Sequence, residues 1–428
     1  MTRAKFVRTS FLLFLLISSF GCSSLISSSE LQIPWMKTYS YTLGVDKAVG
    51  ILQTPDKGFI LIANVGDNTG WWDGWVLKTD PDGRALWNQT YDNKIAKYSE
   101  DLDEFRSGSL TLDGGVILAG YRRHYTSYKE SDDCWVVKTD CKGDIMWNYT
   151  YGKMTIAESI IQTKDGAYAI AGVKNHTFWL LKINNKGGEE WSQTYTKNLG
   201  GNRSYERAHD LIQTSDGGFL LTGYTQPKWR GPESIWVVKT NIHGEMEWNQ
   251  TYGSSGIDVR SECIQTQGNG FLLAGYICIS DIRGYSDWVI KINENGEQEW
   301  NQTYENALFG SIIQLKTGDF ALVGSISNGA DTKGWLVKIN NQGVTQWNQT
   351  YNDGVVDLVQ TDDGGFALVG WTNSYYPPHL WLIRTDSNGT SPPIATSVNT
   401  FEMDLFPLVL FSILALFWYK KRKKRRIQ

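Results

Sequence analysis

The chain has 428 residues and a formal net charge of −4, and the ten basic residues close to its two ends leave about −14 for the segment between them. An acidic surface repels a phosphate backbone, so nucleic acid is excluded as an expected partner. The five cysteines include no C-x-x-C pair, which excludes the usual spacing of a zinc site.

Residues 1–30 have the layout of a secretory signal. Three basic residues between positions 3 and 8 precede an apolar run at 11–17, and small residues stand before Cys22. This order is typical of an exported protein. Cys22 is a candidate lipidation site, as the first residue of a mature lipoprotein, and a signal without lipidation is the alternative. The sequence therefore predicts that residues 31–390 lie outside the cell.

The segment 31–390 is built from seven copies of one phrase, in which I-Q-T-x-D-G-G-F, L-x-G-Y, W-V-x-K-T-D-x-x-G and W-N-Q-T-Y follow one another. Asp-Gly and Asn-Gly pairs between the runs favour tight antiparallel turns. Four-stranded units at a period of about 40–50 residues predict a β-propeller. In the first unit, the runs with the alternating, β-branched and aromatic character of strands are Val49–Leu52, Phe59–Ala63, Trp75–Lys78 and Leu86–Tyr91.

The order of the runs predicts how the ring closes. No W-N-Q-T-Y run follows the last turn glycine, Gly389, whereas an unattached copy, Trp35–Tyr39, stands before the first complete unit. The N-terminal run is therefore expected to complete the last blade, which removes the sheet edges that invite aggregation. The predicted fold class is an all-β, seven-bladed β-propeller closed by an N-terminal strand, with one C-terminal transmembrane helix.

The W-V-x-K-T-D-x-x-G-x-x-x-W pattern, which spans Trp75–Trp87 in the first unit, resembles the tryptophan-docked repeats of quinoprotein-like (PQQ-like) β-propellers. It is still more similar to a group of propeller surface proteins of archaea and bacteria. The resemblance covers Trp35 to Gly389 and implies a propeller at the cell surface. A quinone-dependent member of the wider group would hold a metal-bound quinone and a catalytic carboxylate in its central funnel.

The chain ends in an apolar run followed by seven consecutive basic residues. Residues 405–419 are expected to form a transmembrane helix, because the run has no polar face and its aromatic and basic flanks extend the span. The positive-inside rule places the tail 420–428 in the cytoplasm and the propeller outside. Residues 391–404 are then a short stalk. A processed C-terminal sorting signal shares the apolar-then-basic layout and is the alternative.

Aromatic residues in variable loops are the candidate ligand-binding residues. Fourteen of the 19 tryptophans occupy two repeat positions and are expected to fill the core between blades. Turns between strands one and two and between strands three and four are short in every unit, whereas the other connections vary in length and share one face. Binding residues of a rigid scaffold gather on such loops. The candidates are Trp71, Trp72, Tyr125, Tyr128, Trp229, Tyr285, Tyr375 and Tyr376; packing within their own loops is the alternative.

Eight Asn-x-Ser/Thr sequons occur, and five of them are part of the W-N-x-T-Y phrase itself. In that phrase the asparagine is expected to hydrogen-bond between blades. Asn175, Asn202 and Asn388 fall in loops or turns, and they are the candidate glycosylation sites.

Taken together, these patterns favour a membrane-anchored surface module that binds a glycan, peptide or protein through its variable-loop face without a cofactor. The alternative is an extracellular enzyme, either a glycoside hydrolase or a quinone-dependent dehydrogenase, with its site in the central funnel. Such an enzyme needs acids or metal ligands that converge from several blades. The sequence names no catalytic or metal-ligating residue, because the five histidines lie in different units and lack metal spacing.

Overall fold

The computed structural model describes residues 33–41, 45–66, 72–91, 102–126, 129–197, 205–226, 233–256, 261–279, 284–327, 329, 331–372, 378–391 and 398–400. All regular elements within these residues are β-strands. The described residues contain no helix that is long and apolar enough to cross a membrane. The expected secretory signal with Cys22, and the expected transmembrane segment 405–419, lie outside the described residues.

The strands form seven sheets, which are the blades of the propeller. Blades one to three contain β2 (Val45–Gln53), β3 (Phe59–Gly66), β4 (Trp72–Thr79) and β5 (Ala85–Tyr91); β6 (Leu102–Leu110), β7 (Val116–Thr126), β8 (Lys129–Thr139) and β9 (Ile145–Tyr151); and β10 (Thr155–Gln162), β11 (Tyr168–Lys174), β12 (Thr177–Ile183) and β13 (Glu189–Tyr195). Blades four to six contain β14 (Tyr205–Gln213), β15 (Phe219–Gln226), β16 (Glu233–Thr240) and β17 (Met246–Gly256); β18 (Ser261–Gln265), β19 (Phe271–Ile279), β20 (Gly284–Ile292) and β21 (Gln298–Glu305); and β22 (Ala307–Gln314), β23 (Phe320–Ser327), β24 (Thr332–Ile339) and β25 (Thr345–Tyr351). Blade seven contains β26 (Gly354–Gln360), β27 (Phe366–Trp371), β28 (Leu380–Thr385), β1 (Trp35–Ser40) and β29 (Val398–Thr400).

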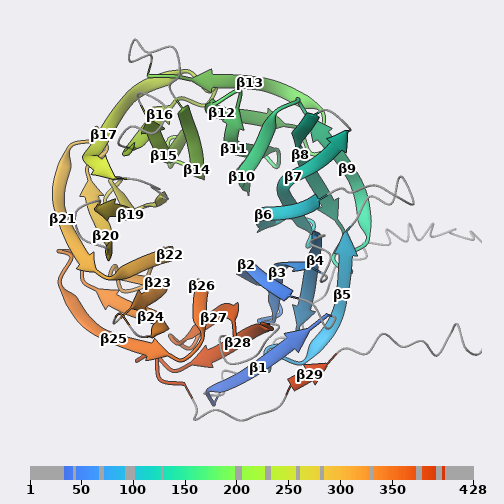
Figure 1. Cartoon of the computed structure of the whole chain (residues 1–428), viewed down its shortest axis with the longest axis vertical. Coiled ribbons are helices and arrows are strands. Elements are labelled where there is room, and N and C mark those ends of the chain that lie inside the picture. The colour runs from blue at the N-terminus through green and yellow to red at the C-terminus, as the bar shows by residue number, and fades with distance from the viewer. Residues whose placement is uncertain are drawn as a thin grey trace, which may run out of the picture.

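The blades stand around a central axis, with the first strand of each blade innermost and the fourth at the rim (Figure 1). The last blade takes its fourth strand from the N-terminus, because β1 pairs antiparallel with β28 from Trp35 opposite Arg384 to Tyr39 opposite Leu380. The predicted seven-bladed propeller and its closure by the N-terminal strand are both confirmed. The short strand β29, within the segment expected as a stalk, pairs in parallel with β1 at the rim.

The core lies between blades rather than inside any one of them. Both faces of a middle strand are covered by neighbouring blades, and β3 is accordingly buried at every position. Burial falls toward the rim, where every residue of β13 except Tyr195 is exposed or half-buried. The tryptophan of the third strand fills the gap between blades, as expected, and is at most 1% exposed at Trp75, Trp135, Trp179, Trp236 and Trp381. The fourth-strand tryptophan is only half-buried, as Trp87 shows.

The W-x-x-T-Y phrase joins each blade to the next. In six blades the hydroxyl of its tyrosine donates to the carbonyl oxygen of the second turn glycine of the following blade, as from Tyr39 to Gly83 at 2.6 Å and from Tyr91 to Gly143 at 2.8 Å. The tryptophan of the same phrase covers that glycine in most blades, and Tyr149 takes its place over Gly187. A Cβ on Gly83 would lie 2.3 Å from the Trp35 ring, so a side chain there would push the blades apart.

The asparagine of the phrase bonds differently from our expectation. Asn88 Oδ1 accepts a hydrogen bond from Nε1 of Trp75, and Asn249 Oδ1 accepts one from Nε1 of Trp236. Donor and acceptor lie on paired third and fourth strands of one blade, so the predicted bond between blades is wrong for these residues. The physical reason is the strand register, which places Asn88 opposite Leu77, two residues from Trp75 and on the same face of the sheet.

Candidate functional site

The ring has one uniform face and one variable face. Every described turn between the first and second strands, and between the third and fourth, is five residues long. The connections between the second and third strands and between blades range from one residue to ten. Because alternate connections of an antiparallel sheet emerge at the same end, the five-residue turns form the uniform face and the others form the variable face. The expected division of the two faces is confirmed.

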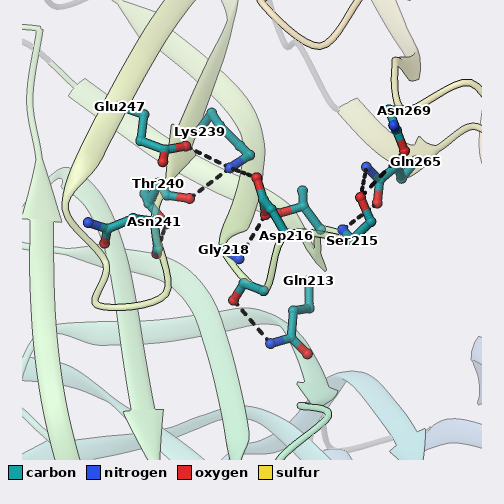
Figure 2. Close-up of polar contacts among 12 residues, drawn as sticks. Gln213, Ser215, Asp216, Gly218, Lys239, Thr240, Asn241, Glu247, Gln265 and Asn269 are labelled. Atoms are coloured by element: carbon teal, nitrogen blue, oxygen red, sulfur yellow. Dashed lines mark hydrogen bonds and ion pairs between the residues drawn. The ribbon is translucent and has the colours of Figure 1, made fainter.

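Polar groups on the uniform face bond to one another. Figure 2 shows Lys239 between Asp216, Glu247 and the carbonyl oxygen of Thr240, at 2.8, 2.7 and 3.0 Å from its Nζ. Burial opposes ionisation of Asp216, but hydrogen bonds from Lys239 and Thr214 outweigh it and lower its pKa to about 2. The basic residue recurs in the other blades, paired with a turn acid in most of them, as in Lys78 with Asp56, Lys138 with Asp113, Lys182 with Asp165, Lys338 with Asp319 and Arg384 with Asp363.

Glutamines of the I-Q-T phrase tie the uniform face together around the ring. Gln265 Oε1 accepts a hydrogen bond from the backbone N–H of Ser215 in the preceding blade at 2.7 Å (Figure 2). The second turn acids are turn formers, as the sequence indicates, because Asp80 Oδ1 accepts from the backbone N–H groups of Asp82 and Arg84. The lysines, turn acids and glutamines of the repeat on this face therefore form hydrogen bonds within and between blades.

The aromatic residues predicted from the sequence fall largely outside what the structure describes. Trp72 begins β4, opposite Gly66, and its side chain is half-buried. Tyr125 lies opposite Glu130 in blade two, and Tyr285 lies opposite Cys278 in blade five. The side chains of Tyr125 and Tyr285 are not described, and five more candidates lie outside the described residues, so this prediction stays untested. These five are Trp71, Tyr128, Trp229, Tyr375 and Tyr376, and the candidate glycosylation site Asn202 also lies outside the described residues.

The innermost strands supply a group of charges that the sequence analysis missed. Six of these strands shift register around one bulged residue, which adds a side chain at that point of the strand. In blades two, three and four the bulged residues are Arg106, Glu158 and His209. The corresponding residues elsewhere are uncharged: Val49, Gly310 and Val356.

These charges pair across blades. Arg207 of β14 forms an ion pair with Glu158 of β10, and Arg106 forms one with Glu104 at 3.4 Å within β6. Burial raises the pKa of Glu158, but Arg207, Arg106 and His209 outweigh burial and hold it below its usual value. Glu158 is therefore a carboxylate at neutral pH, fixed between positive groups of two neighbouring blades.

Aromatic rings continue this cluster onto the variable face. The ring of His176, at the tip of blade three, lies 4.7 Å from that of Tyr205, which stacks on Tyr224 at 5.9 Å, and Tyr224 lies 5.3 Å from His209. On the other side, Arg106 lies 5.3 Å from the centre of the Tyr121 ring. The rings thus connect exposed His176 with the charged residues of the innermost strands.

A cavity of about 220 Å³ opens beside His176 on the variable face. Met154, Ile156 and Val173 give it apolar walls, and Tyr205 borders it from blade four. Its remaining lining residues, Asp132, Asn175 and His176, offer hydrogen-bonding groups. We call this pocket and its seven lining residues the blade-three cavity.

Two acids of the innermost strands are held in ion pairs. Glu104 and Glu158 each form an ion pair with an arginine. Among the described residues no three His, Cys, Asp or Glu side chains are placed to hold a metal ion. An alignment of the innermost strands would have drawn attention to Arg106, Glu158 and His209, because three consecutive copies carry these residues where others have Val49, Gly310 and Val356.

Comparisons with known proteins support the fold. No family model matches the chain, and no curated protein matches it. The Dos1 propeller aligns with a TM-score of 0.50 at 10% identity, over 86% of this chain and 98% of that one. The phage phi92 endosialidase aligns at 0.48 and 9% identity, over 86% and 71%, and BamB from Moraxella catarrhalis at 0.40 and 10% identity, over 81% and 85%. At these identities the likeness shows a β-propeller and nothing finer.

Proposed function

We propose that this protein is a membrane-anchored β-propeller at the cell surface that binds a glycan, peptide or protein through its variable face. The observation that supports the proposal most strongly is the contrast between the two faces. Polar groups of the uniform face bond to one another, whereas blades two to four present the blade-three cavity, exposed His176 and a ring series on the variable face. Ligand sites of this kind combine apolar walls with a few placed polar groups.

Export and anchoring are proposed from the two ends of the chain. The basic and apolar segments within 1–30 and the run 405–428 suit a secretory signal and a spanning helix with a cytoplasmic tail. Cys141, in the turn between β8 and β9, takes part in a disulfide bond, which is typical of oxidising compartments outside the cytosol. The W-V-x-K-T-D repeat also supports a place among PQQ-like surface propellers, as a structural relationship without the quinone.

Binding of the full-length chain to glycan and peptide arrays tests the function. We expect a ligand whose binding is reduced in Tyr205→Ala, because Tyr205 borders the cavity and stacks on its neighbours. Leu112→Ala is the matched control: Leu112 is an apolar side chain 83% exposed on the uniform face, and its removal should leave binding unchanged. Loss of binding in Leu112→Ala with retention in Tyr205→Ala would contradict the proposed face.

A second assay tests the anchor. Protease added to intact cells should digest the propeller and leave a basic C-terminal fragment in the membrane fraction. Recovery of the whole chain in the soluble cytosolic fraction would contradict both export and anchoring.

A further inference from the structure

The blade-three cavity arises from a difference in height between neighbouring blades. The middle strands β7 and β8 of blade two have 11 residues each, whereas β11 and β12 of blade three have seven. At about 3.3 Å per residue, blade two rises roughly 13 Å above its neighbour. Asp132 projects from this taller hairpin, and the two-residue turn Asn175–His176 closes the lower one.

Backbone conformation is unusual at this cavity. Met154, Asn175 and His176 have φ values of 57°, 51° and 67°, in the left-handed region that side chains other than glycine seldom adopt. The other described non-glycine residues with positive φ are Lys57, Asn269 and Asn306, and the first two stand where most blades have a turn glycine. Half of these strained residues therefore line one cavity, and such strain gathers at ligand sites.

The turn itself is held from both sides. The backbone N–H of Asn175 donates to the carbonyl oxygen of Met154 at 3.3 Å, and that of Glu206 donates to the carbonyl oxygen of His176 at 2.8 Å. Two-residue turns with positive φ at both positions prefer glycine at the second. The backbone of His176 is therefore held in a conformation that costs more for histidine than for glycine.

The charge at the rim of the cavity is neutralised. Arg123 donates to both carboxylate oxygens of Asp132, at 2.6 and 3.1 Å, because the two residues are register partners in β7 and β8. Each carboxylate oxygen keeps a lone pair for a further donor. An ion is not attracted strongly by such a pair, whereas a hydroxyl group gains an oriented acceptor.

We propose that the blade-three cavity binds one neutral pyranose ring of a glycan, a proposal that rests on the proposed function and names its ligand class. An apolar sugar face would lie against Met154 and Tyr205, and the hydroxyl edge would meet Asp132, Asn175 and His176. The volume of about 220 Å³ is below the ~300–1,000 Å³ of drug-sized ligand pockets, so a single ring fills it. An apolar peptide side chain would leave the polar rim unpaired, which disfavours that occupant.

The test is a titration of the full-length chain in detergent with methyl glycosides of glucose, galactose, mannose and N-acetylglucosamine. Binding is detected by saturation-transfer NMR. We expect at least one to bind at millimolar affinity or tighter. His176→Gly should weaken binding about tenfold, or ~1.4 kcal/mol, because it deletes the ring. Glycine is the favoured residue at this turn position, so the variant keeps the hairpin. Asp132→Asn should also weaken binding, and Leu112→Ala on the opposite face should not.

The outcomes separate this inference from the proposed function. Binding of a glycoside that is equally strong in His176→Gly and Asp132→Asn would overturn the site. Binding of array peptides alone, lost in His176→Gly, would overturn the ligand class while leaving a binding module. No binding to any glycoside or array would overturn both proposals. Binding weakened in both cavity variants and unchanged in Leu112→Ala would support the inference.

Discussion

Removal of β1 is expected to destabilise the whole ring, because this strand completes the sheet of blade seven and leads directly into blade one. In a chain that lacks residues 33–40, β28 loses its five register partners in β1. Tyr39, which is 0% exposed, and its hydrogen bond to Gly83 are lost as well. Deletion of one buried aromatic side chain costs about 3–5 kcal/mol, and a buried carbonyl left without its donor costs about 1–3 kcal/mol.

A loss of about 5 kcal/mol would remove a large part of the ~5–15 kcal/mol by which proteins are stable. Thermal unfolding followed by tryptophan fluorescence should show a Tm lower by about 7 °C. A synthetic peptide of residues 31–41 added in trans should restore part of it. Tyr39→Phe, which deletes only the hydroxyl, should cost about 1 kcal/mol. An unchanged Tm in the shortened chain, with no effect of the peptide, would refute closure by this strand.

Three further changes test individual contacts. Burial raises the pKa of Asp46 to about 7 despite hydrogen bonds that lower it. The folded state therefore prefers the protonated carboxyl group. The stability that this preference adds is fully present below about pH 4 and is lost as the pH rises through 7. Urea midpoints of the wild type should fall between pH 5 and pH 7.5 by more than those of Asp46→Asn, and parallel curves would show that Asp46 does not titrate in this range. Lys239→Met should lower the free energy of unfolding by about 1–2 kcal/mol, since the acid partners of Lys239 are half exposed and screened by water. Lys239→Arg should keep most of this stability. Equal losses in both variants would contradict a role for the positive charge. Gly244→Ala should lower the Tm more than Gly217→Ala. Both glycines have positive φ, but only a Cβ on Gly244 would lie 2.6 Å from a ring, that of Trp191. Similar melting temperatures would show that the Trp191 ring does not constrain this position.

The fold could be predicted from the sequence because each blade repeats the same physical solution. A tryptophan fills each gap, glycines permit the turns, and the position of Trp35–Tyr39 before the first unit indicates where the ring closes. The repeat also distinguished the two faces, since five-residue turns recur in every blade on the uniform face, whereas connections on the variable face differ in length. Strand bounds were too short at most ends, because the strands extend past their apolar residues into polar loop residues.

The site could not be predicted in the same way. Arg106, Glu158 and His209 each stand at a bulge of an innermost strand, and a bulge has no signal in a single repeat. The cavity depends on the height difference between blades two and three and on left-handed residues such as Met154. The asparagine bond was assigned to the wrong partner because the pattern gives spacing along a strand, not register across it.

Hydrogen exchange measured by mass spectrometry, with and without the array-selected ligand bound to the full-length chain, tests the central claim most directly. The account predicts slower exchange in the variable-face segments around residues 154–156 and 173–177, and unchanged exchange in the uniform-face turns 111–115 and 140–144. Protection confined to the uniform-face turns would contradict binding through the variable face.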